Sequence, residues 1–230
     1  MENASKALLM AGGILIALMV IGALLLMFNQ IGDYEKAQTN DKKVSQFVDF
    51  NKEYVKYTYD DIKGYDLISL INKAIDFNEK EIPVSNSVDY DKKITIKVNN
   101  INNKNNNKNT FIGKYGVSGE ASLFKEETYE ITDSKNALST AISKFSELEK
   151  TYTLGVMSKL SANYDLIKNR EKTIEEIVGR KITYNNKEIS LEEIEQYREY
   201  SEFKNSTFRS DADPIYDGEQ VVILSFKFVK

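Results

Sequence analysis

The residues best suited to chemistry are four acidic side chains within a short stretch, "SDADPIYDGE", near the C-terminal end of the sequence. Clustered carboxylate oxygens are the ligands that hard cations such as calcium prefer. Their spacing does not match the helical calcium-binding loop, and Pro214 and Gly218 serve a turn equally well. We predict a solvated turn and no metal site, and cation binding remains the open alternative. The acidic residues are Asp211, Asp213, Asp217 and Glu219.

Other short patterns are weaker candidates for catalysis or cofactor binding. The stretch "GKYGVSGE", 113–120, has three glycines but lacks both the Lys-Ser/Thr ending of a P-loop and the dinucleotide spacing. Ser158 and Lys159 are adjacent, without the Ser-x-x-Lys spacing of a nucleophile pair. We therefore predict no catalytic residue, no cofactor and no cofactor-binding residue. Three carboxylate pairs are interpreted as helix first-turn or strand-edge charges: Glu126–Glu127, Glu175–Glu176 and Glu192–Glu193.

Two absences from the composition exclude whole classes of function. The chain has no cysteine and no histidine, so it can form no disulfide, no thiolate or imidazole zinc site and no Ser-His-Asp triad. An enzyme built from it would need carboxylate, lysine, tyrosine or Ser-Lys chemistry, and we predict that the protein is not an enzyme. The net charge of -4 offers no basic field, so we predict no nucleic-acid partner.

The longest uncharged stretch is an apolar run from Ala7 to Phe28. A helix of this length is roughly 33 Å long at about 1.5 Å per residue, enough for a bilayer core of about 30 Å. Secretory signal cores are shorter, and no Ala-x-Ala cleavage pattern follows this run. A buried core helix would normally carry a polar stripe. We predict that residues 1–30 form an uncleaved, single-pass transmembrane anchor whose partner is the lipid bilayer.

Small residues recur at four-residue spacing within the apolar run. Ala7 pairs with Ala11, and Gly13 pairs with Ala17. Small residues one turn apart allow membrane helices to approach closely. They predict a helix-packing face that supports a homo-oligomer or a pilus-like assembly. The alternative is that glycine and alanine are simply common in membrane helices.

The elements that follow the anchor predict an α+β fold. Residues 31–60 are expected to form an amphipathic stalk helix, and residues 61–230 a domain with an antiparallel sheet and packed helices. Within the domain, "KKITIKV" predicts a strand with Ile94, Ile96 and Val98 on one face. Residues 99–110, with eight asparagines, predict a mobile loop. The apolar stripe of the stalk is Val44, Phe47, Val48, Tyr54, Val55 and Thr58.

Capping and periodicity predict the remaining elements of the domain. One helix is expected after Lys63-Gly64 with Asp66 as its cap, and a long helix from Asp133-Ser134 to Ile167, in which Gly155 is a weak point. Two shorter helices have capping boxes at Thr173/Glu176 and Ser190/Glu193, and Asn185-Asn186 predicts a hairpin. The last strand is predicted to place on one face Val222, Leu224, Phe226 and Phe228.

Three segments together resemble a known group of proteins. These are "MENASKALLMAGGILIALMVIGALLLMFNQ", "FNKEYVKYTYDDIKGYDLISLINKAI" and the pair "EYSEFKNSTF" and "YDGEQVVILSFKF". They resemble small membrane-anchored proteins of low-GC Gram-positive bacteria, which mostly have no assigned function. The layout is similar to that of type IV pilin-like proteins. Prepilins also carry a basic leader and a glutamate at the fifth position of the apolar run, and this sequence has neither.

The resemblance and the composition lead to one functional hypothesis and two alternatives. We expect a membrane-anchored structural or interaction subunit, pilin-like in layout, with its α+β domain outside the cell. A membrane-tethered, carboxylate-dependent enzyme is one alternative, and three acidic side chains in one pocket would favour it. A cytoplasm-facing adaptor is the other. Lysines on the domain side of the anchor favour it, because positive loops face the cytoplasm: Lys36, Lys42 and Lys43 against Lys6.

Overall fold

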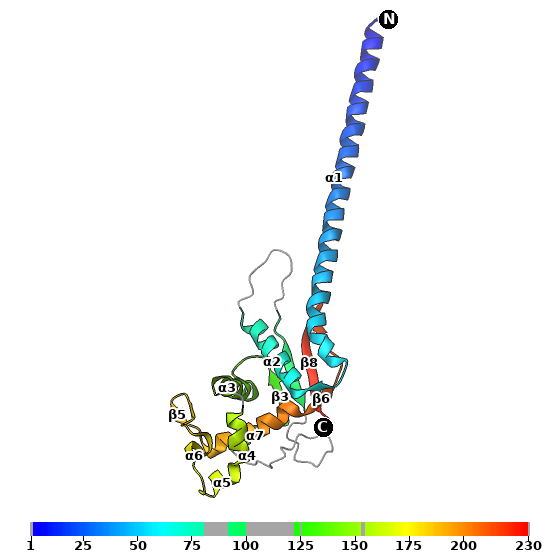
Figure 1. Ribbon diagram of the computed structural model, residues 1–230. Coiled ribbons are helices and arrows are strands. Elements are labelled where there is room, and N and C mark those ends of the chain that lie inside the picture. Colours follow the sequence, from blue (N-terminus) through cyan, green and yellow to red (C-terminus); the bar gives the residue numbers. More distant parts are fainter. Residues whose placement is uncertain (1, 81–91, 100–121, 125, 153–154, 230) are drawn as a thin grey trace. The chain divides into compact units, whose positions relative to one another are not determined.

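The computed structural model describes residues 2–80, 92–99, 122–124, 126–152 and 155–229. They fall into two compact units. The first is helix α1 (Glu2–Val55) as far as Asp49, and the second begins at Phe50 and so includes the last turns of α1. Figure 1 shows the elements of both units along the chain.

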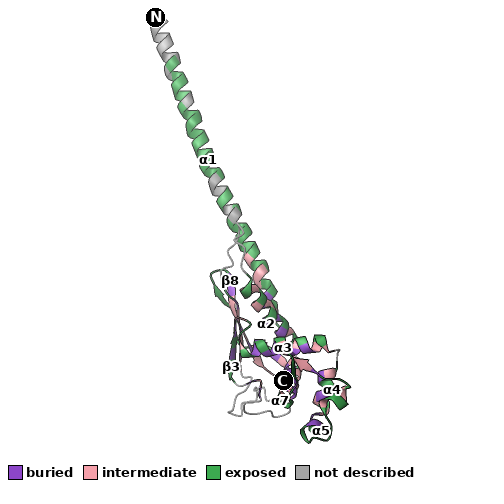
Figure 2. Cartoon of the chain, turned by 90° about the vertical axis from the view of Figure 1, so that its left-hand side faces the viewer, coloured by how far each residue is buried: buried purple, intermediate pink, exposed green. Residues whose placement is uncertain are grey.

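The first unit is a single helix in which the predicted anchor and most of the predicted stalk are continuous. It contains a segment, Gly12–Ile31, that is long and apolar enough to cross a membrane. Side chains described in this segment are exposed, as the green part of α1 in Figure 2 shows. Within the predicted stalk stripe, Val44 and Val48 are also exposed.

The last turns of α1 belong to the core of the second unit. Tyr54 and Val55 are buried there, and the centre of the Phe50 ring lies 5.0 Å from that of Phe77 on helix α2 (Gly64–Glu79). The Asn51 side chain donates to the Glu219 carbonyl at 2.6 Å and accepts from the Val221 amide at 2.8 Å. The predicted stripe therefore changes its environment along its length. A short 3₁₀ turn, η1 (Lys56–Thr58), follows α1.

The second unit contains a mixed sheet, with strand order β1-β6-β8-β2-β3 and with β7 also paired to β8. The prediction of an antiparallel sheet is wrong for one pair, because β2 and β8 run parallel. Parallel neighbours need a long crossover connection, and the whole helical part of the chain between β3 and β6 lies between these two strands. The strands are β1 (Ile62–Lys63), β2 (Thr95–Asn99), β3 (Thr128–Ile131), β6 (Thr207–Ser210), β7 (Ile215–Asp217) and β8 (Gln220–Phe228).

A β-bulge changes the buried face of β8. Ile215 pairs with Ile223, but the next residue of β7, Tyr216, pairs with Val221, so that Val222 is the extra residue. An extra residue reverses the alternation of side chains beyond it. Val221 is therefore completely buried, whereas the predicted core residue Val222 is only half-buried. Leu224 and Phe226 are buried as predicted, and Phe228 packs partly against the core.

The long helix predicted from Asp133 to Ile167 is wrong, because three helices replace it. The first begins after an Asn136 cap, whose side chain accepts from the Leu138 amide at 2.9 Å. Gly155 then has φ +112°, a left-handed conformation that starts a new helix, and Asn163 separates the last two. The three are α3 (Ala137–Thr151), α4 (Val156–Ala162) and α5 (Tyr164–Lys168).

The two predicted capping boxes and the hairpin are confirmed, whereas the N-cap residue of α2 is Lys63 and not the predicted Asp66. Thr173/Glu176 and Ser190/Glu193 form capping boxes on α6 (Ile174–Val178) and α7 (Leu191–Asn205). Asn185 and Asn186 have positive φ in the turn between β4 (Thr183–Tyr184) and β5 (Lys187–Glu188). Asp66 caps α2 (Gly64–Glu79) from inside the helix, because its carboxylate accepts from the Lys63 amide at 3.3 Å.

Helix α2 contacts the rest of the domain through two close approaches. A Cβ added at Gly64 would lie 1.8 Å from the Phe203 carbonyl oxygen of α7, and the Gly64 amide donates to Ser206 at 2.8 Å. At the other end, the Asn78 amide nitrogen donates to the carbonyls of Ile94 (2.7 Å) and Thr132 (2.6 Å). Its oxygen accepts from the Ile94 amide at 2.8 Å. One side chain therefore joins α2 to β2 and to the end of β3.

Ile96 and Val98 of strand β2 are buried as predicted, and so is Ile94, which directly precedes the strand. The predicted Asn-rich loop starts inside this strand, because Asn99 is its last residue. Residues 100–110, and the glycine-rich stretch 113–120, lie outside the described part of the chain.

Candidate functional site

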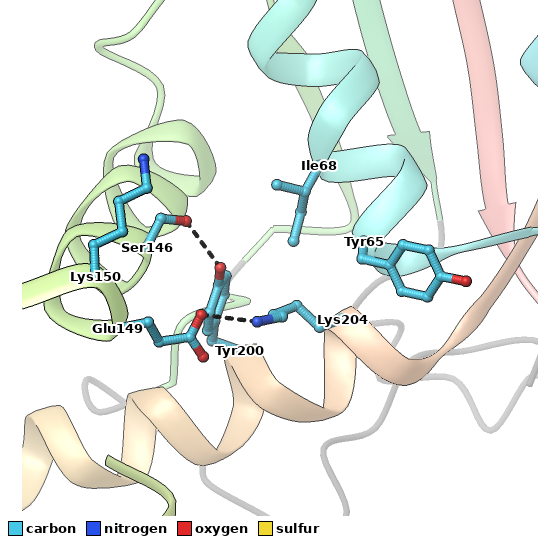
Figure 3. Close-up of a pocket in the computed structure, with 7 residues that line it drawn as sticks. All are labelled: Tyr65, Ile68, Ser146, Glu149, Lys150, Tyr200 and Lys204. Carbon is cyan, nitrogen blue, oxygen red and sulfur yellow. Dashed lines mark hydrogen bonds and ion pairs between the residues drawn. The ribbon is translucent and has the colours of Figure 1, made fainter. Parts of the chain in front are cut away.

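An open cleft of about 540 Å³ lies among helices α2, α3 and α7 of the second unit. Figure 3 shows the side chains around it. Apolar and aromatic groups share its surface with charged groups, which is the usual make-up of a small-molecule site. The lining residues are Tyr65, Ile68, Ser146, Glu149, Lys150, Tyr200 and Lys204.

Helical spacing places the polar groups of the cleft. Tyr200 and Lys204 lie four residues apart on α7 and so share a face, as Ser146 and Glu149 do three residues apart on α3. The Tyr200 hydroxyl lies 3.0 Å from the Ser146 hydroxyl. The Lys204 amine pairs with the Glu149 carboxylate at 2.8 Å and lies 5.4 Å from the centre of the Tyr200 ring. Two contacts across the helix pair therefore fix these side chains (Figure 3).

A second tyrosine extends this network. The Tyr197 hydroxyl donates to the Glu149 carboxylate at 2.8 Å, and Ser158 of α4 also hydrogen-bonds to it. Burial raises the pKa of Tyr197 to about 12 and also raises the pKa of Tyr200. Both phenols are therefore neutral near pH 7 and act as hydrogen-bond donors and acceptors, not as bases. Glu149 and Lys204 also line a neighbouring cavity of about 90 Å³.

The arrangement is suited to binding. Glu149 is the single carboxylate of the cleft, and its charge is already matched by Lys204. The three converging acidic side chains that would favour an enzyme are not found in this cleft. Ser158 contacts a tyrosine, so the structure gives no support to the Ser158–Lys159 pair as a nucleophile and base.

The acidic turn near the C terminus is arranged around lysines. The Asp211 carboxylate pairs with Lys227 at 2.9 Å and accepts from Asn99 at 2.8 Å, and the bond from Lys227 lowers the pKa of Asp211. Asp217 pairs with Lys92 at 2.7 Å. In the part of the chain that the structure describes, no group of three or more acidic residues could hold a metal ion.

The predicted packing face of the anchor lies within α1. The space beside Gly13 is open, because a Cβ added there would meet no atom within 4 Å. Ala7, Ala11 and Ala17 belong to the same helix, but their side chains lie outside the described residues. Contact through this face therefore remains a prediction.

None of the cleft residues was singled out from the sequence. A signal was present on α7, where Tyr197, Tyr200 and Lys204 follow one another at helical spacing. That spacing indicates a shared face, but the partner carboxylate comes from α3, about fifty residues away in the sequence. Only the tertiary fold brings Glu149 to this face.

Comparisons with known proteins give no relative: no family model, no curated protein and no solved structure matches this chain.

Proposed function

We propose that this protein is a single-pass membrane protein whose α+β domain, outside the cell, acts as a structural or interaction subunit. The observation that carries the proposal is the exposed apolar segment Gly12–Ile31 of α1. A helix of this length reaches roughly 30 Å, the thickness of a bilayer core. Exposed apolar surface of this extent needs a lipid or protein environment to cover it.

The cleft supports interaction as the work of the domain. Burial raises the pKa of Tyr200, the carboxylate of Glu149 is paired with Lys204, and Ile68 adds an apolar group to the lining. Such a surface can hold a ligand or a partner side chain without carrying out a reaction. The pilin-like layout that the sequence resembles adds assembly of several copies to the proposal.

Membrane anchoring is tested by extraction of the full chain from cell membranes with alkaline carbonate. We expect the parent protein to stay in the membrane fraction with its intact mass. The variant Leu18→Arg/Leu25→Arg should be lost from that fraction, because each central charge costs about 2.5–3.5 kcal/mol on insertion. Release of the parent protein by carbonate, or a mature mass lacking the apolar segment, would contradict the proposal.

The side of the membrane on which the domain lies is tested separately. Because the natural chain has no cysteine, a single Tyr59→Cys change supplies one labelling site on a side chain that is 74% exposed. An impermeant maleimide should label this variant in intact cells as fully as in permeabilised cells. Labelling only after permeabilisation would instead support the cytoplasm-facing adaptor.

A further inference from the structure

The side chain of Glu199 on helix α7 is a buried carboxyl group that plays no part in the cleft. The residue is only 2% exposed. Its Oε2 accepts from the Leu123 amide at 2.6 Å, and the Ser122 hydroxyl lies 3.3 Å from both of its oxygens. A glutamate is almost never fully buried without a charged partner, so this position needs an explanation.

The groups that Glu199 contacts belong to the segment that leads into strand β3. Phe124 in this segment packs on Phe203 of α7 (5.2 Å between ring centres) and on Tyr129 of β3 (6.4 Å). The Tyr129 hydroxyl donates to the Leu123 carbonyl at 3.4 Å and accepts from the Glu126 amide at 3.1 Å. The carboxyl group of Glu199 thus adds polar contacts to the aromatic packing between this segment and α7.

The charged groups around Glu199 do not compensate an ionised carboxylate. Glu195 and Glu202, one turn away on the same helix, both raise the pKa of Glu199. From the described residues of the facing segment, Ser122 and Leu123 contribute neutral donors, and the titratable Tyr129 phenol is bonded to Leu123 and Glu126. Among the described residues, no lysine or arginine forms an ion pair with Glu199. Burial is the main cause that raises the pKa of Glu199 to about 7, and the two bonds from the segment oppose it.

Ser122 and Leu123 both donate to the carboxylate, and reversing the bond with Ser122 satisfies the protonated carboxyl group as well. Its Oε2 can accept from the Leu123 amide while its O–H donates to the Ser122 oxygen. The Ser122 hydroxyl then donates to the Phe124 carbonyl, 3.4 Å away. When the carboxyl ionises, the same contacts must hold a negative charge away from water, which is costly.

We propose that Glu199 is a pH-sensitive clamp, which holds the Ser122–Phe124 segment on helix α7 when protonated and loosens it when ionised. The carboxyl group of the unfolded chain has an ordinary pKa of 4.5, so the folded chain binds the extra proton between pH 4.5 and about 7. The contribution to stability is therefore complete below pH 4.5 and is lost as the pH rises to about 7.

The test compares full-length protein in detergent micelles at pH 5 and pH 8, as parent and as Glu199→Gln. Glutamine has the same shape and can accept from Leu123 while donating to Ser122, but it does not titrate. The equilibrium constant for unfolding in urea should be on the order of 100-fold larger at pH 8 than at pH 5 in the parent, from the shift of the pKa from 4.5 to about 7. It should change much less in Glu199→Gln.

The matched control is Glu192→Gln, which removes an exposed carboxylate from the same helix and should keep the pH dependence of the parent. An equal pH dependence in Glu199→Gln and the parent would overturn the proposal.

Two measurements on the parent test the proposal even if Glu199→Gln does not fold. The ¹³C resonance of the Glu199 carboxyl should titrate near pH 7, and a midpoint near 4.5 would end the proposal. Hydrogen exchange of the Leu123 amide, divided by its intrinsic rate, should accelerate from pH 5 to pH 8, and constant protection would end it equally.

Discussion

Single polar side chains make several of the long-range attachments in this domain. Asn78 satisfies three backbone groups at once, and Asn51 satisfies two more between α1 and the start of β8. An amide can do this because it offers both donors and an acceptor. Both asparagines lie in helices, and their partners are distant in the sequence, so their roles could not be predicted from the local pattern.

The first prediction concerns Asn78. Its replacement in Asn78→Ala leaves the Ile94 amide and two carbonyls without their partner, and buried backbone groups left unsatisfied cost about 1–3 kcal/mol each. We expect the free energy of unfolding in urea to fall by about 3 kcal/mol. Asn205→Ala is the control, because this exposed side chain bonds only within its own helix, to Ser201. Similar losses in the two variants would refute the attachment described for Asn78.

Among the elements, the close packing of helix α2 against helix α7 depends on Gly64. Where α2 begins, only a residue without a Cβ allows the backbone to approach the Phe203 carbonyl. The sequence interpretation expected the helix to begin after Lys63-Gly64, but Lys63 is the last residue of β1 and Gly64 is the first residue of α2. It also missed the contact between the two helices, because Phe203 lies far along the chain.

The second prediction follows from this contact. Gly64→Ala should destabilise the domain by about 3 kcal/mol, the upper end for overpacking, since backbone atoms and not a flexible side chain block the added methyl group. Gly155→Ala is the comparison, because its site is open but its φ is +112°. Strain alone should cost it about 1–2 kcal/mol. Thermal unfolding of both variants measures which one loses more stability. A smaller loss in Gly64→Ala than in Gly155→Ala would show that α2 can move aside.

The sequence predicted the elements of this fold better than their arrangement. Caps and turns depend on neighbouring residues, so the boxes at Thr173 and Ser190 and the asparagine hairpin were predicted correctly. Apolar periodicity continued in phase across Gly155 and so concealed a helix break. The parallel β2–β8 pair and the bulge at Val222 depend on strands that meet only in the folded chain. The cleft and the buried Glu199 depend on tertiary packing in the same way, and "REYSEF" alone suggests an exposed charge.

At the scale of the whole molecule, the end of α1 is part of the domain. The third prediction is that residues 43–230 form a soluble, folded fragment, whereas residues 59–230 do not. The longer fragment keeps Phe50, Asn51, Tyr54 and Val55, which the domain uses for packing and hydrogen bonds. Circular dichroism and urea unfolding of the two fragments measure the difference. A stable 59–230 fragment would show that α1 is only a tether.

The fourth prediction concerns assembly through the anchor. Gly13→Leu/Ala17→Leu keeps the segment apolar while filling the face that would allow another helix to approach. Under the assembly proposal, crosslinked oligomers in membranes should fall severalfold while the total membrane-bound protein stays level. The control Leu18→Ala/Leu25→Ala changes the same helix without filling that face. Equal crosslinking in Gly13→Leu/Ala17→Leu and the parent would contradict assembly through the anchor and would leave the soluble domain as the functional part.

The position of β8 has a consequence for biosynthesis. This strand follows the other strands in the sequence, yet it lies between β6 and β2 and also pairs with β7. While a ribosome is still adding residues 220–228, β2 therefore lacks its parallel neighbour and Val98 cannot yet be buried against Phe226. A nascent chain would have to keep these apolar strands from aggregating until β8 emerges. Products that stop short of β8 should therefore leave the edge of β2 unpaired.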